Sequence, residues 1–155
     1  MKNIFFYETK IGRIGIVESG NAITNLYFHE DEIPGDVTVN ETELLKEAGR
    51  QLHSYLAGKQ KEFSLPLAPA GTDFMLRVWR ALRDIPYGET RSYKQISQSI
   101  GDQKAARAVG LASSRNPVPI FIPCHRVIAT NGKLTGYRGG LDIKEHLLEL
   151  ERQNM

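Results

Sequence analysis

The stretch 116–128 constrains this chain more than any other, because it combines several prolines with the only cysteine, Cys124. The prolines are Pro117, Pro119 and Pro123. Each proline fixes its own φ and pushes the preceding residue towards extended geometry, so a helix is excluded on the approach to the cysteine. We therefore expect a stiff, extended support that presents the thiol at a structural edge.

His125 follows the cysteine directly and makes nucleophilic catalysis a candidate. A lone cysteine is more often a small buried apolar residue, and the histidine beside it can be mere surface decoration. The prolines, the cation of Arg126 and acidic residues downstream add weight to catalysis, because a base or cation lowers a thiol pKa from about 8.5. Neighbours in an extended chain point to opposite sides, so we expect His125 to act on Cys124 through a turn or a bridging water.

Composition and charge exclude several classes of protein. The 155 residues, 41% of them hydrophobic, can form one domain or two small ones around a real core. One cysteine excludes an internal disulfide and a multi-cysteine zinc site. No apolar run is long enough to span a bilayer and residues 1–7 lack a signal-peptide core, so we predict a cytoplasmic protein with no membrane partner. The net charge is only +2, but Arg and Lys dominate residues 77–144.

The first half, residues 1–68, is predicted to be an antiparallel sheet carrying one or two helices. Short β-rich runs separated by glycine turns predict a meander, and they lie at residues 4–7, 13–17 and 23–28. Residues 30–40 predict a loop, and the apolar spacing over 42–56 predicts a helix that ends near Gly58. No polar residues converge here, so we expect this domain to have a supporting role.

The second half, residues 69–155, is predicted to be mostly helical, which makes the fold class α+β. It follows a proline-containing linker, and its helices are expected at residues 73–84, 92–101, 104–113 and 142–151. Asp102 and a capping box from Asp142 to Glu145 are expected to begin the last two of these. Ile143, Leu147 and Leu150 form the expected buried stripe of the final helix.

Two short helices joined by a glycine turn, at 92–101 and 104–113, form a helix-turn-helix pattern. The second helix is almost bare, since small residues such as Ala105, Ala106 and Gly110 surround the long Arg107. Small residues often serve only tight helix packing. A slim helix can also enter a narrow groove, but it has too few long polar side chains to read bases in the major groove. We therefore expect sequence-independent binding in the minor groove, with Arg107 as a wedge.

Three strings together identify a family resemblance. Pro123-Cys-His-Arg-Val127, preceded by Asn116-Pro-Val-Pro119 and followed by Gly136-Tyr-Arg-Gly-Gly140, resembles the O6-alkylguanine-DNA alkyltransferases, also called methylated-DNA–protein-cysteine methyltransferases. The resemblance covers residues 72–151 nearly without gaps. The first half matches only in layout, like the ribonuclease H-like N-terminal domain of such proteins. His146 stands where the family commonly has Trp.

The resemblance implies stoichiometric repair of double-stranded DNA that contains O6-alkylguanine. Cys124 would take the alkyl group and keep it as a thioether. His125 would deprotonate Cys124 through a water, and Glu151 would orient His125, although a glutamate so near a C-terminus is usually only a solvated charge. Asn116 would connect this network to the recognition helix. The zinc ligands of some members are absent, so we predict no metal and no cofactor.

The resemblance also implies a DNA-binding face and a base pocket. Tyr93 would crowd the target phosphate and donate a hydrogen bond to the flipped base, and Arg107 would fill the vacated stack. The other residues expected on the DNA face are Ser92, Ala105, Ala106, Gly110 and Arg115. The residues expected around the base are Pro119, Val127, Tyr137, Arg138 and Lys144.

Two other functions stay open from the residues. A thiol hydrolase with a Cys-His-acid triad would need turnover and leaves the helix-turn-helix pattern unexplained. A non-catalytic DNA-binding sensor of alkylation is the other alternative, and the reactive-type Cys124 argues against it. In every case we expect a monomer with no obligate protein partner.

Overall fold

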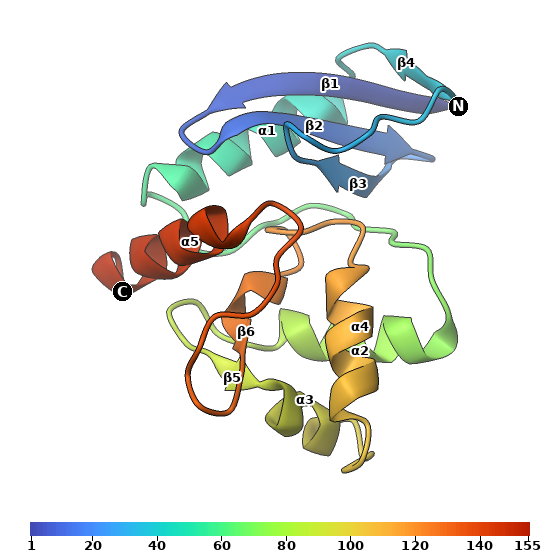
Figure 1. Ribbon diagram of the computed structural model, residues 1–155. Coiled ribbons are helices and arrows are strands. Elements are labelled where there is room, and N and C mark those ends of the chain that lie inside the picture. Colours follow the sequence, from blue (N-terminus) through green and yellow to red (C-terminus); the bar gives the residue numbers. More distant parts are fainter. The chain divides into compact units, whose positions relative to one another are not determined.

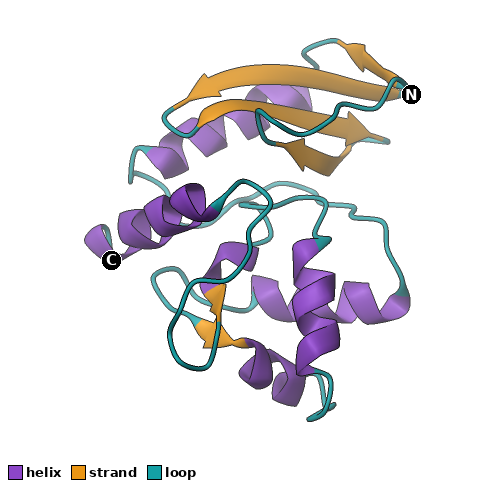
Figure 2. Ribbon diagram, in the orientation of Figure 1, coloured by secondary structure: helices purple, strands orange, loops and turns teal.

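The computed structural model describes all residues from 1 to 155, and they divide into two units, Met1–Pro69 and Ala70–Met155 (Figure 1). The predicted α+β class is confirmed: the first unit holds a sheet and one helix, and the second unit is mostly helical (Figure 2). No helix combines the length and the apolar character that crossing a membrane requires.

The first unit is a four-stranded sheet in the order β3-β2-β1-β4. Its strands are β1 (Lys2–Thr9), β2 (Gly12–Ser19), β3 (Ala22–Tyr27) and β4 (Val37–Val39). The predicted meander is confirmed, because β2 pairs antiparallel with both β1 and β3. The loop prediction for 30–40 is wrong in part: the β-branched run 37–39 pairs with β1 as a parallel edge strand.

Helix α1 (Glu43–Leu56) packs on this sheet with one apolar face. Thr42 begins it by accepting a hydrogen bond from the Leu45 amide, and Gly58 follows its end at φ 76°, as the sequence predicts. The linker after α1 is partly ordered by the sheet, because the Ile23 amide and carbonyl bond to Pro66 and Ala68.

The second unit contains a three-turn helix, a helix-turn-helix pair and a C-terminal helix, with short pieces between them. The elements are α2 (Asp73–Arg83), β5 (Arg91–Ser92), α3 (Tyr93–Ser99), α4 (Ala106–Ser114), the 3₁₀ turn η1 (Cys124–Arg126), β6 (Val127–Ile128) and α5 (Leu141–Gln153). Strands β5 and β6 pair in parallel, which joins the start of α3 to the end of η1.

The predicted helix-turn-helix pair is present as α3 and α4, with Gly101 at φ 82° in the turn. Ser92 and Gln95 form a capping box at the start of α3. The prediction that Asp102 caps a helix from 104 is wrong, because α4 begins at 106 without a side-chain cap of its own. The amide of Ala105 instead donates to Ser97 Oγ of α3 at 3.2 Å, so the neighbouring helix satisfies it.

Helix α2 holds both members of this pair. The buried Trp79 donates its indole N–H to the Ala112 carbonyl of α4 at 2.8 Å. Arg77 donates to the Ile100 carbonyl at the end of α3 at 2.5 Å. Two side chains of one helix therefore fix the ends of two others by carbonyl contacts.

The start and the buried face of α5 differ from the prediction. The helix begins after Gly140 at φ 98° with no capping box, so Asp142 lies within its first turn. Its buried residues are Lys144, Leu147, Leu148 and Glu151, whereas Ile143 and Leu150 are half-buried. The apolar pattern misplaces the stripe because two charged side chains are buried by polar contacts.

Candidate active site

The segment that leads to Cys124 folds into two tight turns. The Ile122 amide donates to the Val118 carbonyl at 2.9 Å, which encloses Ile120 in the left-handed region at φ 75°. Pro123, at φ −80° and ψ 63°, then forms an inverse γ-turn in which the Cys124 amide donates to the Ile122 carbonyl at 2.8 Å. The approach is therefore non-helical as predicted, but the prediction of an extended chain is wrong.

Asn116 braces both turns from the end of α4. Its side-chain oxygen accepts from the Val118 amide at 2.9 Å, and its Nδ2 donates to the Ile122 carbonyl at 2.9 Å. The Ile122 carbonyl thus accepts hydrogen bonds from both Asn116 Nδ2 and the Cys124 amide, so Asn116 and the backbone of Cys124 are held by the same group. Asn116 is 2% exposed, which makes these bonds expensive to lose.

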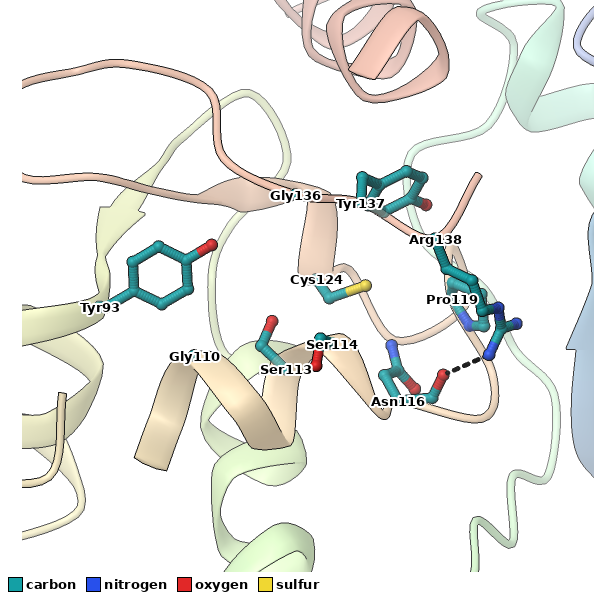
Figure 3. A pocket seen from close by; sticks show the side chains of 10 residues that line it. All are labelled: Tyr93, Gly110, Ser113, Ser114, Asn116, Pro119, Cys124, Gly136, Tyr137 and Arg138. Atoms are coloured by element: carbon teal, nitrogen blue, oxygen red, sulfur yellow. Dashed lines mark hydrogen bonds between the residues drawn. The ribbon is translucent and has the colours of Figure 1, made fainter. Parts of the chain in front are cut away.

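Cys124 lies in a narrow pocket of the second unit (Figure 3). Its lining residues come from α3, from α4, from the turns before Cys124 and from the glycine-rich segment 132–140. They are Tyr93, Gly110, Ser113, Ser114, Asn116, Pro119, Cys124, Gly136, Tyr137 and Arg138. The open space is only about 20 Å³, which is room for about one water molecule. The pocket must therefore widen before it can hold a flat ring.

Two contacts of the glycine-rich segment narrow the pocket. Tyr93 Oη and Thr135 Oγ1 share a hydrogen bond of 2.5 Å on one side. Arg138 Nη1 donates to the Asn116 carbonyl at 3.3 Å on the other, as the dashed line in Figure 3 marks. Behind this wall the buried Lys144 donates from Nζ to the Thr135 carbonyl at 3.1 Å.

His125 points away from the pocket into a buried polar cluster. Its Nε2 lies 2.7 Å from Glu151 Oε2, and both residues are almost fully buried. Burial alone would raise the pKa of Glu151, but the hydrogen bonds and charges of His125 and Arg126 lower that pKa far below its usual range. The carboxylate is therefore ionised and accepts a hydrogen bond from Nε2–H of His125. In a neutral ring, this leaves Nδ1 as the basic nitrogen.

The electrostatics favour the neutral forms of both the Cys124 thiol and the His125 ring. Burial raises the pKa of the Cys124 thiol, and the Asn116 hydrogen bond and the charges of Lys144 and Arg138 only partly oppose it. Burial lowers the pKa of His125, although Glu151 acts in the opposite direction. The thiol is therefore not paired with an imidazolium, and a reaction at the sulfur would require the thiol to lose its proton.

The structure brings together most of the predicted site residues. Those that line the pocket are Cys124, Asn116, Tyr93, Gly110, Pro119, Tyr137 and Arg138. His125 and Glu151 lie behind Cys124 as a bonded pair. Val127 is buried in β6, and Lys144 is buried behind the pocket wall, so neither side chain lines the pocket.

The predicted DNA face lies mainly on α4. Arg107 is exposed in its first turn, close to the half-buried Ala106, whereas Ala105 just before the helix is buried. Ser92 is used as the cap of α3, and Arg115 is exposed at the end of α4.

Some residues of the site escape the sequence reasoning. Ser113 and Ser114 line the pocket three and four positions after Gly110, so the helical repeat could have found them. Arg126 was expected to act as a cation near the thiol, but its guanidinium is directed to Glu151 instead. Nothing in the local sequence shows that direction, because it depends on where α5 returns.

Comparison with known proteins places the chain. A family model described as 6-O-methylguanine DNA methyltransferase, DNA binding domain, matches residues 73–153, and the model of the ribonuclease-like domain of the same methyltransferase matches residues 5–69. The chain belongs to the 6-O-methylguanine DNA methyltransferase family. Its predicted resemblance to the alkyltransferases is thereby confirmed.

Relatives and solved structures of this methyltransferase family match over nearly the whole chain. The methylated-DNA–protein-cysteine methyltransferase of Methanosarcina barkeri is 53% identical over 152 residues, which cover 96% of each chain. The constitutive enzyme of that name from Bacillus subtilis is 49% identical and covers 94% of this chain and 92% of its own. The Mycobacterium tuberculosis OGT crystallised in complex with DNA has a TM-score of 0.93 and 45% identity, covering 98% of this chain and 94% of that one.

Proposed function

We propose that this chain repairs O6-alkylguanine in double-stranded DNA by a single, irreversible transfer of the alkyl group to Cys124. One observation carries the proposal: the only cysteine lies in a pocket beside α4, the second helix of the helix-turn-helix pair and the expected recognition helix, with a buried His125–Glu151 pair directly behind it. Membership of the methyltransferase family and the likeness to a DNA-bound relative support the same conclusion.

The transfer balances without any further reactant. The sulfur of Cys124 forms a bond to the alkyl carbon while the bond from that carbon to guanine O6 breaks. The electron pair of the broken bond leaves with guanine, which takes up a proton and returns to its keto form. The thiol proton passes through a water to Nδ1 of His125, guanine takes its proton from water, and His125 then releases its own proton to water, so one proton is lost and one is gained.

Access to O6 requires the base to leave the duplex. Unstacking costs about a few kcal/mol, which a side chain that fills the gap can offset. Arg107 is suited to this task, because it is exposed on a helix whose other early residues are small. Tyr93 faces the pocket from α3, where it can hydrogen-bond the flipped base once it leaves Thr135.

Damage occurs in any sequence, so phosphate contacts rather than base contacts must dominate the affinity for DNA.

We propose a supporting role for residues 1–68, since the pocket and its polar cluster lie in residues 69–155. We also propose a cytoplasmic location, because a thiol nucleophile has to stay reduced, and cell fractionation tests this.

Intact-protein mass measurement tests the function directly. Protein incubated with excess duplex that contains O6-methylguanine should gain one methyl group and then stop, and peptide mapping should place that group on Cys124. Cys124→Ala should bind the duplex and gain no mass. Continued turnover would instead indicate a hydrolase, and binding of the damaged duplex without any change of mass would indicate a sensor.

A further inference from the structure

The carboxylate of Glu151 is contacted by four donor atoms from three residues of the second unit. Oε1 accepts from Arg126 Nε at 2.8 Å and from the Gly88 amide at 3.1 Å. Oε2 accepts from Arg126 Nη2 at 2.9 Å and lies 2.7 Å from His125 Nε2. Arg126 therefore grips both oxygens of the carboxylate, whereas His125 reaches only one.

The guanidinium is itself held in place on its remaining sides. Its Nη1 donates to the Ile85 carbonyl at 2.7 Å, and its carbon lies 5.7 Å from the centre of the Tyr87 ring. Arg126 is 7% exposed, so water has little access to its guanidinium and competes little for these contacts. A two-pronged arginine with its third nitrogen also bonded has one geometry, and it transmits that geometry to the carboxylate.

We propose that Arg126 is a positioning residue of alkyl transfer: by fixing and neutralising Glu151, it orients His125 and keeps its ring a neutral base for the thiol proton. The inference rests on the proposed function, because it assigns His125 the role of proton acceptor. It gives Arg126 a task different from that of a cation near the sulfur.

Charge counting explains why the arginine matters. Glu151 carries one negative charge, and Arg126 supplies one permanent positive charge, so the pair is neutral before His125 is considered. A protonated His125 would then add an unbalanced charge in a buried place, which is costly. Without Arg126, the imidazolium would become the natural partner of the carboxylate.

The other charged groups around His125 do not change this balance. Glu151 favours the charged ring, and Arg126 and Lys144 oppose it, with Lys144 reaching from the same helix as Glu151. Tyr87, which follows α2, carries no charge, because burial and the charge of Glu151 raise the pKa of its hydroxyl. Removal of Arg126 should therefore raise the pKa of His125, so that the base is lost at a higher pH.

The first test is made on the wild-type protein, with one variant used only to assign a signal. A proton NMR titration of the histidine ring signals in the wild-type protein, with His125 assigned by the loss of its signal in His125→Gln, measures which form is present. The inference requires a neutral His125 ring at pH 7. An imidazolium at that pH would overturn it, whether or not the protein transfers a methyl group, so this failure is separate from failure of the proposed function.

The second test measures the pH profile of the single-turnover methyl transfer between about pH 5 and 8. In Arg126→Met, the acid limb should move to higher pH, so the fold-loss in rate is larger at the acid end than at the basic end. Arg126→Lys keeps the charge but not the two-pronged grip, and it should restore the wild-type midpoint with a lower rate. Rates are expressed per molecule able to accept a methyl group, which removes misfolded protein from the comparison.

Arg152→Met is the matched control. This arginine lies on α5, the helix of Glu151, but its side chain is 63% exposed and pairs only with Glu149. It should leave both rate and midpoint unchanged. If Arg126→Met lowers the rate without moving the midpoint, Arg126 is only a structural residue and the inference is wrong.

Discussion

Glu151 joins stability and chemistry in one side chain. Its carboxylate is ionised, buried and bonded to two basic residues, so it differs from the solvated glutamates found near most C-termini. We expect the loss of its charge to have two separable consequences, one for the alkyl-transfer rate and one for the free energy of unfolding.

Glu151→Gln should slow methyl transfer by about tenfold or more, which is part of a full general-base effect of roughly 10²–10⁴-fold, because the neutral amide holds Nε2–H of His125 more weakly than the carboxylate does. Binding to undamaged duplex should change little, since the residue is far from solvent. Single-turnover rates and a fluorescence anisotropy titration measure the two quantities. An unchanged rate would return Glu151 to a purely structural role.

The same residue predicts an acid-dependent stability. The folded protein holds the pKa of Glu151 well below its ordinary value of 4.5, so the unfolded chain binds a proton that the folded chain does not. The stabilisation is fully present above about pH 4.5 and is lost as the pH falls towards the lower folded-state pKa. Urea unfolding at several pH values should therefore show a steeper acid loss in wild type than in Glu151→Gln.

At the scale of elements, a substitution on α4 tests base flipping separately from alkyl transfer. Arg107→Ala should reduce repair of methylated duplex by about tenfold or more, whereas reaction with free O6-benzylguanine base should stay within about twofold, because the free base needs no extrusion. Rates of Cys124 modification by the two substrates give the ratio. Equal losses with both substrates would remove Arg107 from the flipping role.

We expect the segment 132–140 to limit entry to the pocket through the contact of Thr135 with Tyr93. Thr135→Ala removes the 2.5 Å bond to Tyr93, so the wall should open more easily and the benzyl-to-methyl rate ratio should rise. Thr135→Ser keeps the hydroxyl and is the matched control. A ratio that is the same in all three proteins would show that this contact does not limit access.

How far the sequence predicts these elements depends on whether the cause is local. The end of α1 near Gly58 and the helix-turn-helix turn at Gly101 follow from neighbouring residues, and the structure has them. Strand β4 depends on the unpaired edge of β1, and the direction of Arg126 depends on α5 returning to η1. Partners distant in sequence decide both, so no local pattern contains them.

For the whole molecule, the basic second half predicts how DNA affinity responds to salt. Binding to duplex should fall steeply as salt rises and should vary little between undamaged sequences, because phosphate contacts release counterions. Anisotropy titrations at several salt concentrations measure the slope. Neutralising the exposed Arg115 should reduce that slope by about one phosphate contact.

Trp79 gives this protein an internal optical reporter. It is the only tryptophan, it is 2% exposed, and its indole bonds to the α4 carbonyl that directly precedes the pocket residue Ser113. A displacement of α4 relative to α2 would lengthen or break that bond and so alter the polarity around the ring. The wavelength of maximum tryptophan fluorescence of the unlabelled protein can therefore report, in real time, the movement of α4 when the protein binds a lesion.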